Sequence, residues 1–97
     1  VEEGRGYIEK ALSLQPGSGH ILDSMGWALY LSGEIDESVR YLEQAIEQMP
    51  SDVTVNDHLG DAYWQAGRKT EARFQWQRAL SFGPDKETEA TINAKLK

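Results

Sequence analysis

The sequence repeats itself at an interval of thirty-four residues, and this repetition constrains the fold more than any other feature. Small and helix-ending residues dominate the positions that match. The matched pairs are Asp23 and Asp57, Gly26 and Gly60, Ala28 and Ala62, Gly33 and Gly67, Glu37 and Glu71, Ala45 and Ala79, and Pro50 and Pro84. Ungapped similarity at a period of about 20 to 50 residues is typical of stacked repeats, each unit being one supersecondary motif. We therefore expect a repeat array, which specifies a surface without naming its partner.

Apolar residues recur at helical spacing along the whole chain, and no stretch alternates in the manner of a strand. Gly33 and Gly67 are suited to ending helices, because glycine adopts the left-handed conformation readily. Ser18, and Asp52 or Ser51, are suited to N-caps. The predicted helices cover residues 1–14, 19–32, 35–48, 53–66 and 69–82, and a last one begins at 85. Short glycine-centred links make neighbouring helices antiparallel, so we predict an all-α row of helix hairpins.

Two glycines lie in the middle of predicted helices, where glycine costs about 1 kcal/mol relative to alanine. A side chain at Gly26 or Gly60 would push apart the two helices of a hairpin. We therefore expect a partner helix to approach closely at both positions. Ala45 and Ala79 have the same expected role between successive units.

Composition excludes several functions. Sixteen acidic against ten basic residues give a net charge of -6, and the longest basic run is Arg68 and Lys69, so nucleic acid is a poor hypothesis. No apolar run approaches the roughly 20 residues that span a bilayer, so membrane insertion is not expected. The absence of cysteine excludes disulfides and thiolate sites. The compartment stays open between the cytoplasm and a bacterial cell envelope, since a targeting segment would lie upstream.

The recurring residues match the pattern of the tetratricopeptide repeat (TPR), a family of helix hairpins. In residues 19–52 the pattern is met by Met25, Gly26, Leu29, Ser38, Leu42, Ala45 and Pro50. In residues 53–86 it is met by Leu59, Gly60, Tyr63, Ala72, Trp76, Ala79 and Pro84. Ile8, Ala11 and Pro16 match the second half of a preceding, truncated unit. The chain therefore resembles this family over nearly its whole length.

The resemblance implies one TPR segment over residues 1–97, wound as a right-handed superhelix. Residues 1–18 would be the second helix of a truncated repeat, 19–52 and 53–86 two full repeats, and 87–97 a capping helix. The local sequences around Met25 and Trp76 resemble the C-terminal repeats of longer bacterial TPR proteins. The sequence departs from the pattern at Leu22, Ser38, Asn56, Lys69 and Arg73, where local packing is expected to differ.

The resemblance also implies a concave face lined by the first helix of each repeat. The candidate partner-binding residues on this face are Asp23, Trp27, Tyr30, Asp57, His58, Asp61 and Trp64. Such an acidic and aromatic groove favours a protein or peptide with Lys or Arg and an apolar anchor. The alternative interpretation is that Trp27 and Trp64 pack against neighbouring helices while the carboxylates are merely solvated. The clamp for acidic chaperone tails known in this family is not implied, because Asp23, Trp27 and His58 occupy the matching positions.

Catalysis and cofactors are not expected from these residues. Asp57, His58 and Asp61 are metal-ligand types, but a solvated helix surface is the better interpretation, since no second histidine lies close in sequence. No serine lies in a nucleophile motif. The sequence therefore predicts a protein-binding scaffold and no enzyme. The alternative function is the purely structural or self-associating end of a longer solenoid, which could dimerise through the uncovered side of the first helix, formed by Tyr7, Ile8, Ala11 and Leu12.

Overall fold

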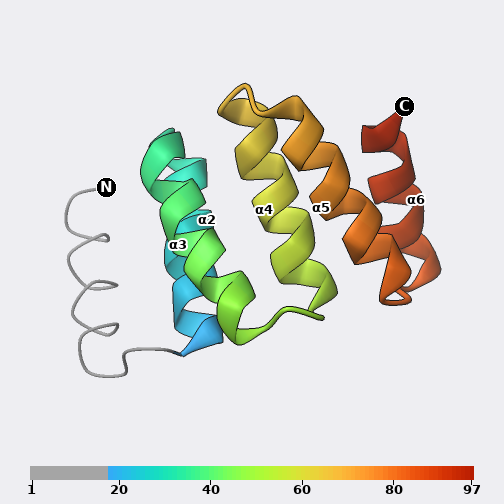
Figure 1. Ribbon diagram of the computed structural model, residues 1–97, viewed down its shortest axis with the longest axis horizontal. Helices are drawn as coiled ribbons and strands as arrows, with labels where there is room; N and C mark the ends of the chain where they lie inside the picture. Colours follow the sequence, from blue (N-terminus) through green and yellow to red (C-terminus); the bar gives the residue numbers. More distant parts are fainter. Residues whose placement is uncertain (1–17) are drawn as a thin grey trace.

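The structure, a computed structural model, describes residues 18–97, and these form five α-helices and no strand (Figure 1). The helices are α2 (Gly19–Leu31), α3 (Ile35–Gln48), α4 (Val53–Gln65), α5 (Lys69–Ser81) and α6 (Lys86–Leu96). Every boundary lies within one residue of the sequence prediction, which is thereby confirmed. The helix predicted over residues 1–14 lies outside the described residues, and so does the dimer surface predicted there.

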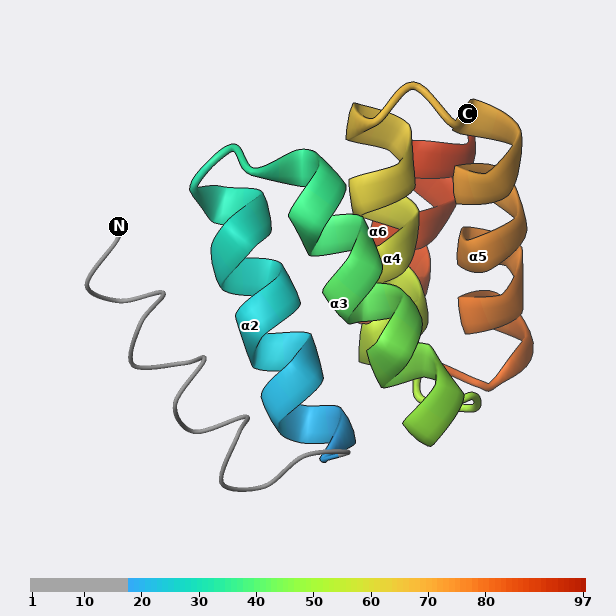
Figure 2. The same cartoon turned by 60° about the vertical axis from the view of Figure 1, so that its left-hand side comes forward.

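The helices form successive antiparallel hairpins that follow one another in chain order. α2 pairs with α3 and α4 with α5, while α3 also packs against α4 and α6 against α5. Figure 1 shows the α2–α3 hairpin at one end of the row and α6 at the other, and Figure 2 shows from a second side α2, α3 and α4 following one another, with α6 behind α4 and α5. The all-α row of hairpins is therefore confirmed for the described part of the chain.

Both hairpins turn through the same glycine-based helix ending. Gly33 and Gly67 have φ values of 84° and 83°, which only glycine adopts without strain. The amide after each glycine returns to the carbonyl five residues earlier, from Glu34 to Leu29 at 2.9 Å and from Arg68 to Tyr63 at 2.8 Å. This is the Schellman arrangement, which satisfies carbonyls that the helix end would leave without partners.

The helices that open each unit begin with a side-chain cap. Ser18 Oγ accepts from Ile21 N–H at 3.5 Å, and Asp52 Oδ1 accepts from Val55 N–H at 2.9 Å. α6 begins in the same way, since Asp85 Oδ1 accepts from the amide three residues further on at 2.7 Å. Hydrogen bonds from the backbone and the side chain of Thr88 lower the pKa of Asp85. α3 and α5 have no side-chain cap, because they enter directly from the glycine turns.

Close approach within each hairpin explains the mid-helix glycines. A Cβ at Gly26 would lie 2.6 Å from Leu42 Cγ, and one at Gly60 would lie 2.5 Å from Trp76 Cδ1. Real side-chain contacts are never this short, so the partner side chain fills the space that a methyl group would need. The predicted role of both glycines is confirmed.

The core consists of two clusters, each of which joins the two units. Its main cluster takes residues from α3, α4, α5 and α6, and a second cluster joins Leu22 of α2, Ala45 of α3 and Val55 of α4. Ala45 and Ala79 are fully buried, as expected for positions where helices approach closely. The main cluster consists of Val39, Leu42, Leu59, Ala62, Tyr63, Ala72, Trp76, Ala79 and Ile92.

Two departures from the TPR pattern are buried polar residues with defined partners. Ser38 is fully buried and its hydroxyl donates to the Gly26 carbonyl at 2.7 Å, which ties α3 to α2. Asn56 is also fully buried, and its Nδ2 donates to the carbonyls of Pro50 at 3.2 Å and Asp52 at 2.8 Å. These bonds hold the α3–α4 link against the start of α4. Both substitutions therefore replace apolar packing with hydrogen bonds.

Candidate functional site

A stack of three rings joins α2 to α4. The Trp27 ring lies 3.9 Å from the His58 ring, with 13° between the planes, and 4.6 Å from the Tyr30 ring, with 7° between the planes. Trp27 therefore lies between a ring from its own helix and one from the next unit. Offset aromatic contacts of this kind contribute about 0.5 to 1.5 kcal/mol beyond the area that they bury.

His58 also contacts a carboxylate of the preceding unit. Its Nδ1 lies 2.9 Å from Asp23 Oδ1, and the two side chains are only 19% and 17% exposed. Because an ionised carboxylate only accepts hydrogen bonds, Nδ1 carries the proton in this contact. Asp23, Trp27 and His58 thus form one joint between the units.

A second joint connects α4 to α6 through one lysine and two carboxylates. Lys95 Nζ lies 2.8 Å from Asp57 Oδ1 and 2.9 Å from Asp61 Oδ1. Asp61 accepts a further hydrogen bond from Trp76 Nε1 at 3.3 Å. Two negative charges therefore share one positive charge at this place.

Burial and charge shift the pKa values of this cluster. Burial raises the pKa of Asp61, although the bonds from Lys95 and Trp76 oppose the shift. For Lys95, burial alone would lower the pKa, but the bonds to Asp57 and Asp61 together outweigh it and raise the pKa. The ammonium is therefore fixed as a cation, whereas Asp61 is a carboxylate at some cost in hydration.

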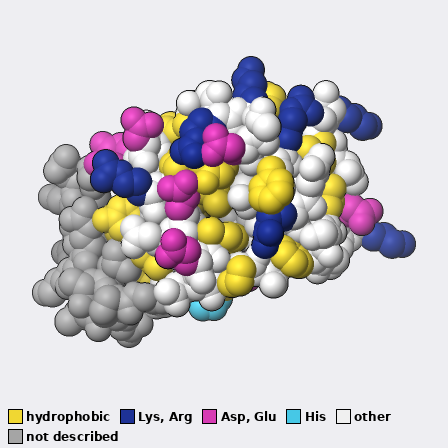
Figure 3. All heavy atoms as spheres, viewed as in Figure 1, with side chains coloured by type: hydrophobic (Ala, Val, Ile, Leu, Met, Phe, Trp, Pro, Cys, Tyr) yellow, Lys and Arg dark blue, Asp and Glu magenta, His cyan; other side chains and the backbone are white. Residues whose placement is uncertain are grey.

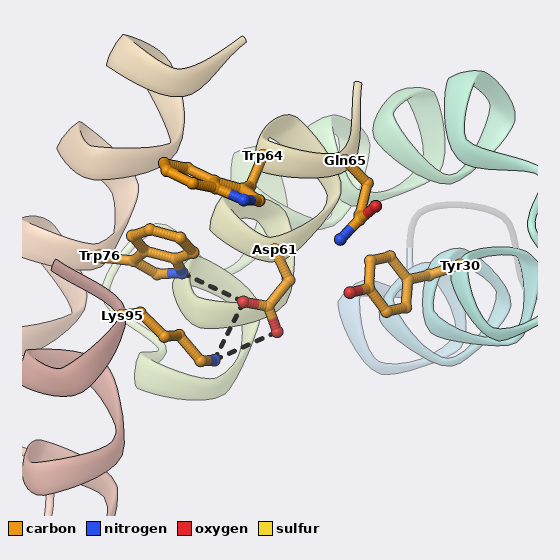
Figure 4. Close-up of a pocket in the computed structure, with 6 residues that line it drawn as sticks. All are labelled: Tyr30, Asp61, Trp64, Gln65, Trp76 and Lys95. Atoms are coloured by element: carbon orange, nitrogen blue, oxygen red, sulfur yellow. Dashed lines mark hydrogen bonds and ion pairs between the residues drawn. The ribbon is translucent and has the colours of Figure 1, made fainter. Parts of the chain in front are cut away.

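A cavity of about 300 Å³ opens beside this cluster. Figure 4 shows the Asp61 carboxylate at its centre, with Trp64 and Trp76 on one side and the Tyr30 hydroxyl facing it from the other. The two indole rings are 5.5 Å apart and tilted by 35°. Burial, followed by the charge of Asp61, raises the pKa of Tyr30, so its hydroxyl keeps its proton. The lining residues are Tyr30, Asp61, Trp64, Gln65, Trp76 and Lys95.

Cations from α5 cover the outer part of Trp64. Lys69 Nζ lies 4.8 Å and the Arg73 guanidinium 5.9 Å from the centre of its ring. Arg73 also donates to the Leu96 carbonyl at 3.1 Å, which links α5 to the end of α6. The two basic departures from the TPR pattern therefore serve an aromatic residue of the neighbouring helix, by cation–π attraction.

The structure groups the seven predicted site residues into two clusters. Asp23, Trp27 and His58 meet at the α2–α4 joint, and Asp57 and Asp61 meet at Lys95. Tyr30 and Trp64 line the cavity with Asp61. The interpretation of these carboxylates as merely solvated is wrong, because each has a partner within the chain. The companion interpretation, that Trp27 and Trp64 pack against neighbouring side chains, is correct.

Two lining residues, Lys95 and Trp76, were not predicted from the sequence. Lys95 lies thirty-eight positions from Asp57, and no rule of spacing connects a lysine of the last helix to that carboxylate. Trp76 was assigned to the buried stripe alone, although an indole N–H in a core needs an acceptor, and this need could have indicated Asp61.

Acidic and basic side chains surround exposed hydrophobic ones on the face shown in Figure 3, the acids mostly toward α3 and the bases mostly toward α5 and α6.

Among residues 18–97, no group of three or more His, Cys, Asp or Glu side chains is arranged to hold a metal ion. In the same part of the chain, no helix has the length and apolarity needed to cross a bilayer.

Solved structures with the same fold include a chaperone and a TPR protein. The type III secretion translocator chaperone SycD of Yersinia enterocolitica has a TM-score of 0.88 at 15% identity, over 98% of this chain and 75% of that one. The N-terminal domain of stress-induced protein-1 of C. elegans has a TM-score of 0.80 at 19% identity, over 99% and 81%. A thermophilic TPR protein of Thermus thermophilus has a TM-score of 0.75 at 27% identity, over 98% and 53%. No curated protein sequence matches significantly.

Stacked antiparallel hairpins with a shared core and glycine-based turns define a helical repeat protein, an α-solenoid. The sequence profile of the tetratricopeptide repeat matches residues 24–87. The chain belongs to the tetratricopeptide repeat family, and the resemblance in the sequence is thereby confirmed. TPR domains bind proteins or peptides, so the general class of function is protein interaction.

Proposed function

We propose that this chain binds a peptide or an extended protein segment on the face formed by α2, α4 and α6, and that it catalyses no reaction. The cavity between Tyr30, Asp61 and Trp64 carries this proposal, because aromatic walls around a few polar groups are typical of binding sites. The remainder of the predicted site, Asp23, Trp27, Asp57 and His58, borders the same face and would extend the contact.

The charge of this face favours a partner with basic and apolar residues. Asp57 and Asp61 share the single charge of Lys95, which leaves one negative charge unbalanced. Asp23 adds a further negative charge beside the Trp27 ring. Aromatic rings attract cations and are frequent anchors in interfaces. A segment that alternates Lys or Arg with apolar side chains suits both features.

One observation favours a second function. The three carboxylates all have partners inside the chain, so their contacts also serve to join α2, α4 and α6. On this alternative the described helices support or dimerise a longer solenoid and bind no peptide. Residues 1–14, through which a dimer was predicted, lie outside the described part, so this remains a prediction.

Fluorescence polarisation with labelled synthetic peptides distinguishes the two functions. The peptides vary only in their content of Lys, Arg, Phe and Leu, and each is titrated with the 97-residue chain. The double variant Asp57→Asn, Asp61→Asn is expected to weaken binding of basic-apolar peptides about tenfold, since charge-assisted contacts are lost. Asp36→Asn removes the same kind of charge from the exposed surface of α3 and should leave binding unchanged.

Sedimentation of the same samples tests the alternative. If no peptide in the series binds and the Asp57 and Asp61 variants change only thermal stability or the monomer–dimer balance, the structural function replaces the proposed one. If Asp36→Asn weakened peptide binding equally, the loss would come from the overall charge of the molecule and not from the proposed site.

A further inference from the structure

The cavity beside Asp61 already contains a cation, and that cation comes from the chain itself. Lys95 extends from α6 to the two carboxylates of α4, and its Nζ also lies 5.8 Å from the centre of the Trp76 ring. Carboxylates and aromatic faces are the two groups that attract ammonium and guanidinium ions. The contacts of Lys95 therefore reveal which chemistry the cavity accepts.

Lys95 can leave the cavity without the release of its helix. Its side chain is 26% exposed and ends a flexible four-carbon stem, so the ammonium has a path to water. α6 is anchored independently, because Ile92 is fully buried in the core and Arg73 donates to the Leu96 carbonyl. The lysine contact is thus a separable part of the α4–α6 joint.

The size of the cavity limits what can enter it. A volume of about 300 Å³ lies at the lower end of ligand pockets, which range from roughly 300 to 1,000 Å³. This suits one long side chain and excludes a whole peptide. The Asp61 carboxylate and the Tyr30 ring are arranged to contact the charged end of such a side chain, while Trp64 covers its stem (Figure 4).

We propose that the cavity binds one lysine or arginine side chain of a partner segment, and that Lys95 occupies the carboxylates until that side chain displaces it. This inference rests on the proposed function, for which it names one anchoring residue of the partner. It makes Lys95 an internal competitor, so the apparent affinity equals the intrinsic affinity multiplied by the fraction of time that the site is free. Removal of this lysine should then tighten binding, whereas loss of a residue that contacts the partner weakens it.

Nuclear magnetic resonance of the three tryptophan indole N–H groups tests the inference on the 97-residue chain. The probes are Nα-acetyl-arginine methylamide and Nα-acetyl-lysine methylamide, with the glutamine and glutamate analogues as uncharged and anionic controls. Trp64 and Trp76 line the cavity, and Trp76 Nε1 donates to Asp61, so both signals should move when a cation binds. Trp27 does not line the cavity and contacts it only through the Tyr30 ring, so its signal should move less than the other two.

Lys95→Gln is expected to tighten binding of the two cationic probes about tenfold. Lys97→Gln, which removes the same charge from an exposed position next to α6, should change it less than about twofold. Asp61→Asn should abolish the shifts, and its backbone amide spectrum checks that the chain is still folded. Unchanged or weaker binding by Lys95→Gln would overturn the inference, and so would preference for the glutamate probe.

A longer basic-apolar peptide separates this inference from the proposed function. If the peptide shifts Trp27 but neither Trp64 nor Trp76, the face binds a partner without using the cavity, which refutes only the present inference. If it shifts none of the three signals, both proposals fail. Shifts of all three, with tighter binding in Lys95→Gln, support both.

Discussion

The two hairpins have the same backbone conformation at their turns but differ in the side chains that pack between their helices. Their turns agree in φ to within a degree, 84° and 83°, and make the same hydrogen bonds. The space left by the missing side chain of a mid-helix glycine, here called a notch, is filled by Leu42 at Gly26 and by Trp76 at Gly60. The Trp76 indole N–H also donates to Asp61. The glycine therefore fixes how closely the helices approach, while the residue opposite determines whether that unit also carries polar chemistry.

The hairpins also differ in how polar groups hold them. In the first, the Ser38 hydroxyl donates to the Gly26 carbonyl inside the unit. In the second, the position equivalent to Ser38 is Ala72, and Tyr63 instead donates to Glu43 of the first unit at 2.6 Å. Burial and this bond raise the pKa of Tyr63. The first hairpin is thus reinforced by a hydroxyl bond inside the unit, whereas the second combines the internal bond from Trp76 to Asp61 with a bond to the preceding unit.

The largest expected effect comes from emptying the two notches. Trp76→Ala should lower the free energy of unfolding by about 4 kcal/mol and Leu42→Ala by about 3 kcal/mol, because both side chains are buried and leave cavities. Urea unfolding followed by circular dichroism measures both. Equal or reversed losses would contradict this order.

Filling the notches should have a smaller effect. Gly60→Ala is expected to destabilise by about 2 kcal/mol, because the rigid Trp76 ring cannot move away from a methyl group. Gly26→Ala should cost about 1 kcal/mol, since Leu42 can change rotamer and alanine favours the helix. The same unfolding curves decide the order, and a stabilised Gly60→Ala variant would show that the notch is not needed.

Exchanging the polar residue tests whether the units are interchangeable. Ser38→Ala removes a buried hydrogen bond and should cost about 1 kcal/mol. Ala72→Ser introduces the hydroxyl at the equivalent place opposite Gly60, and should change stability by less than about 0.5 kcal/mol, because the new bond offsets the burial of the hydroxyl. A loss as large as that of Ser38→Ala would mean that the second hairpin cannot accept this bond.

The smallest effect is the acid dependence of stability in the second unit. Because burial raises the pKa of Asp61, the folded chain binds this proton more tightly than the unfolded chain. The contribution is therefore stabilising below the ordinary aspartate pKa and is lost as pH rises through the raised one. Carbon NMR of the carboxyl groups should show Asp61 titrating above Asp85, whose pKa is lowered.

Asp61→Asn should remove this slope from the pH profile of stability. Asp36→Asn, on the exposed surface of α3, serves as the matched control and should leave the slope in place. Coincident titration of Asp61 and Asp85 would contradict the effect of burial.

The backbone could be predicted from the sequence because its determinants are local. Gly33 and Gly67 end helices by their own φ values, and Ser18 and Asp52 cap the residues three positions ahead. The 34-residue period added one prediction about residues far apart in the sequence, namely that the helices of the second unit pack in the same way as those of the first. Handedness and the division into repeats were implied by the family alone.

The candidate site could be predicted only in part, because its pairings cross between units. The period put Asp23 and Asp57 in equivalent positions, yet one contacts His58 and the other Lys95. These partners lie outside the repeated positions, and their reach depends on side-chain rotamers that spacing does not specify. The residue types of the face were thus predictable, but the contacts that determine its charge were not.

The cap at Asp85 has a consequence for the growth of such arrays. α2, α4 and α6 all begin with an oxygen that accepts from the amide three residues ahead, so α6 begins in the same way as the helix that opens each unit. A second helix joined to it by a left-handed glycine would lengthen the molecule by one module and leave every earlier joint intact. Extension by whole hairpins therefore requires no new kind of junction, only another copy of two that the chain already uses.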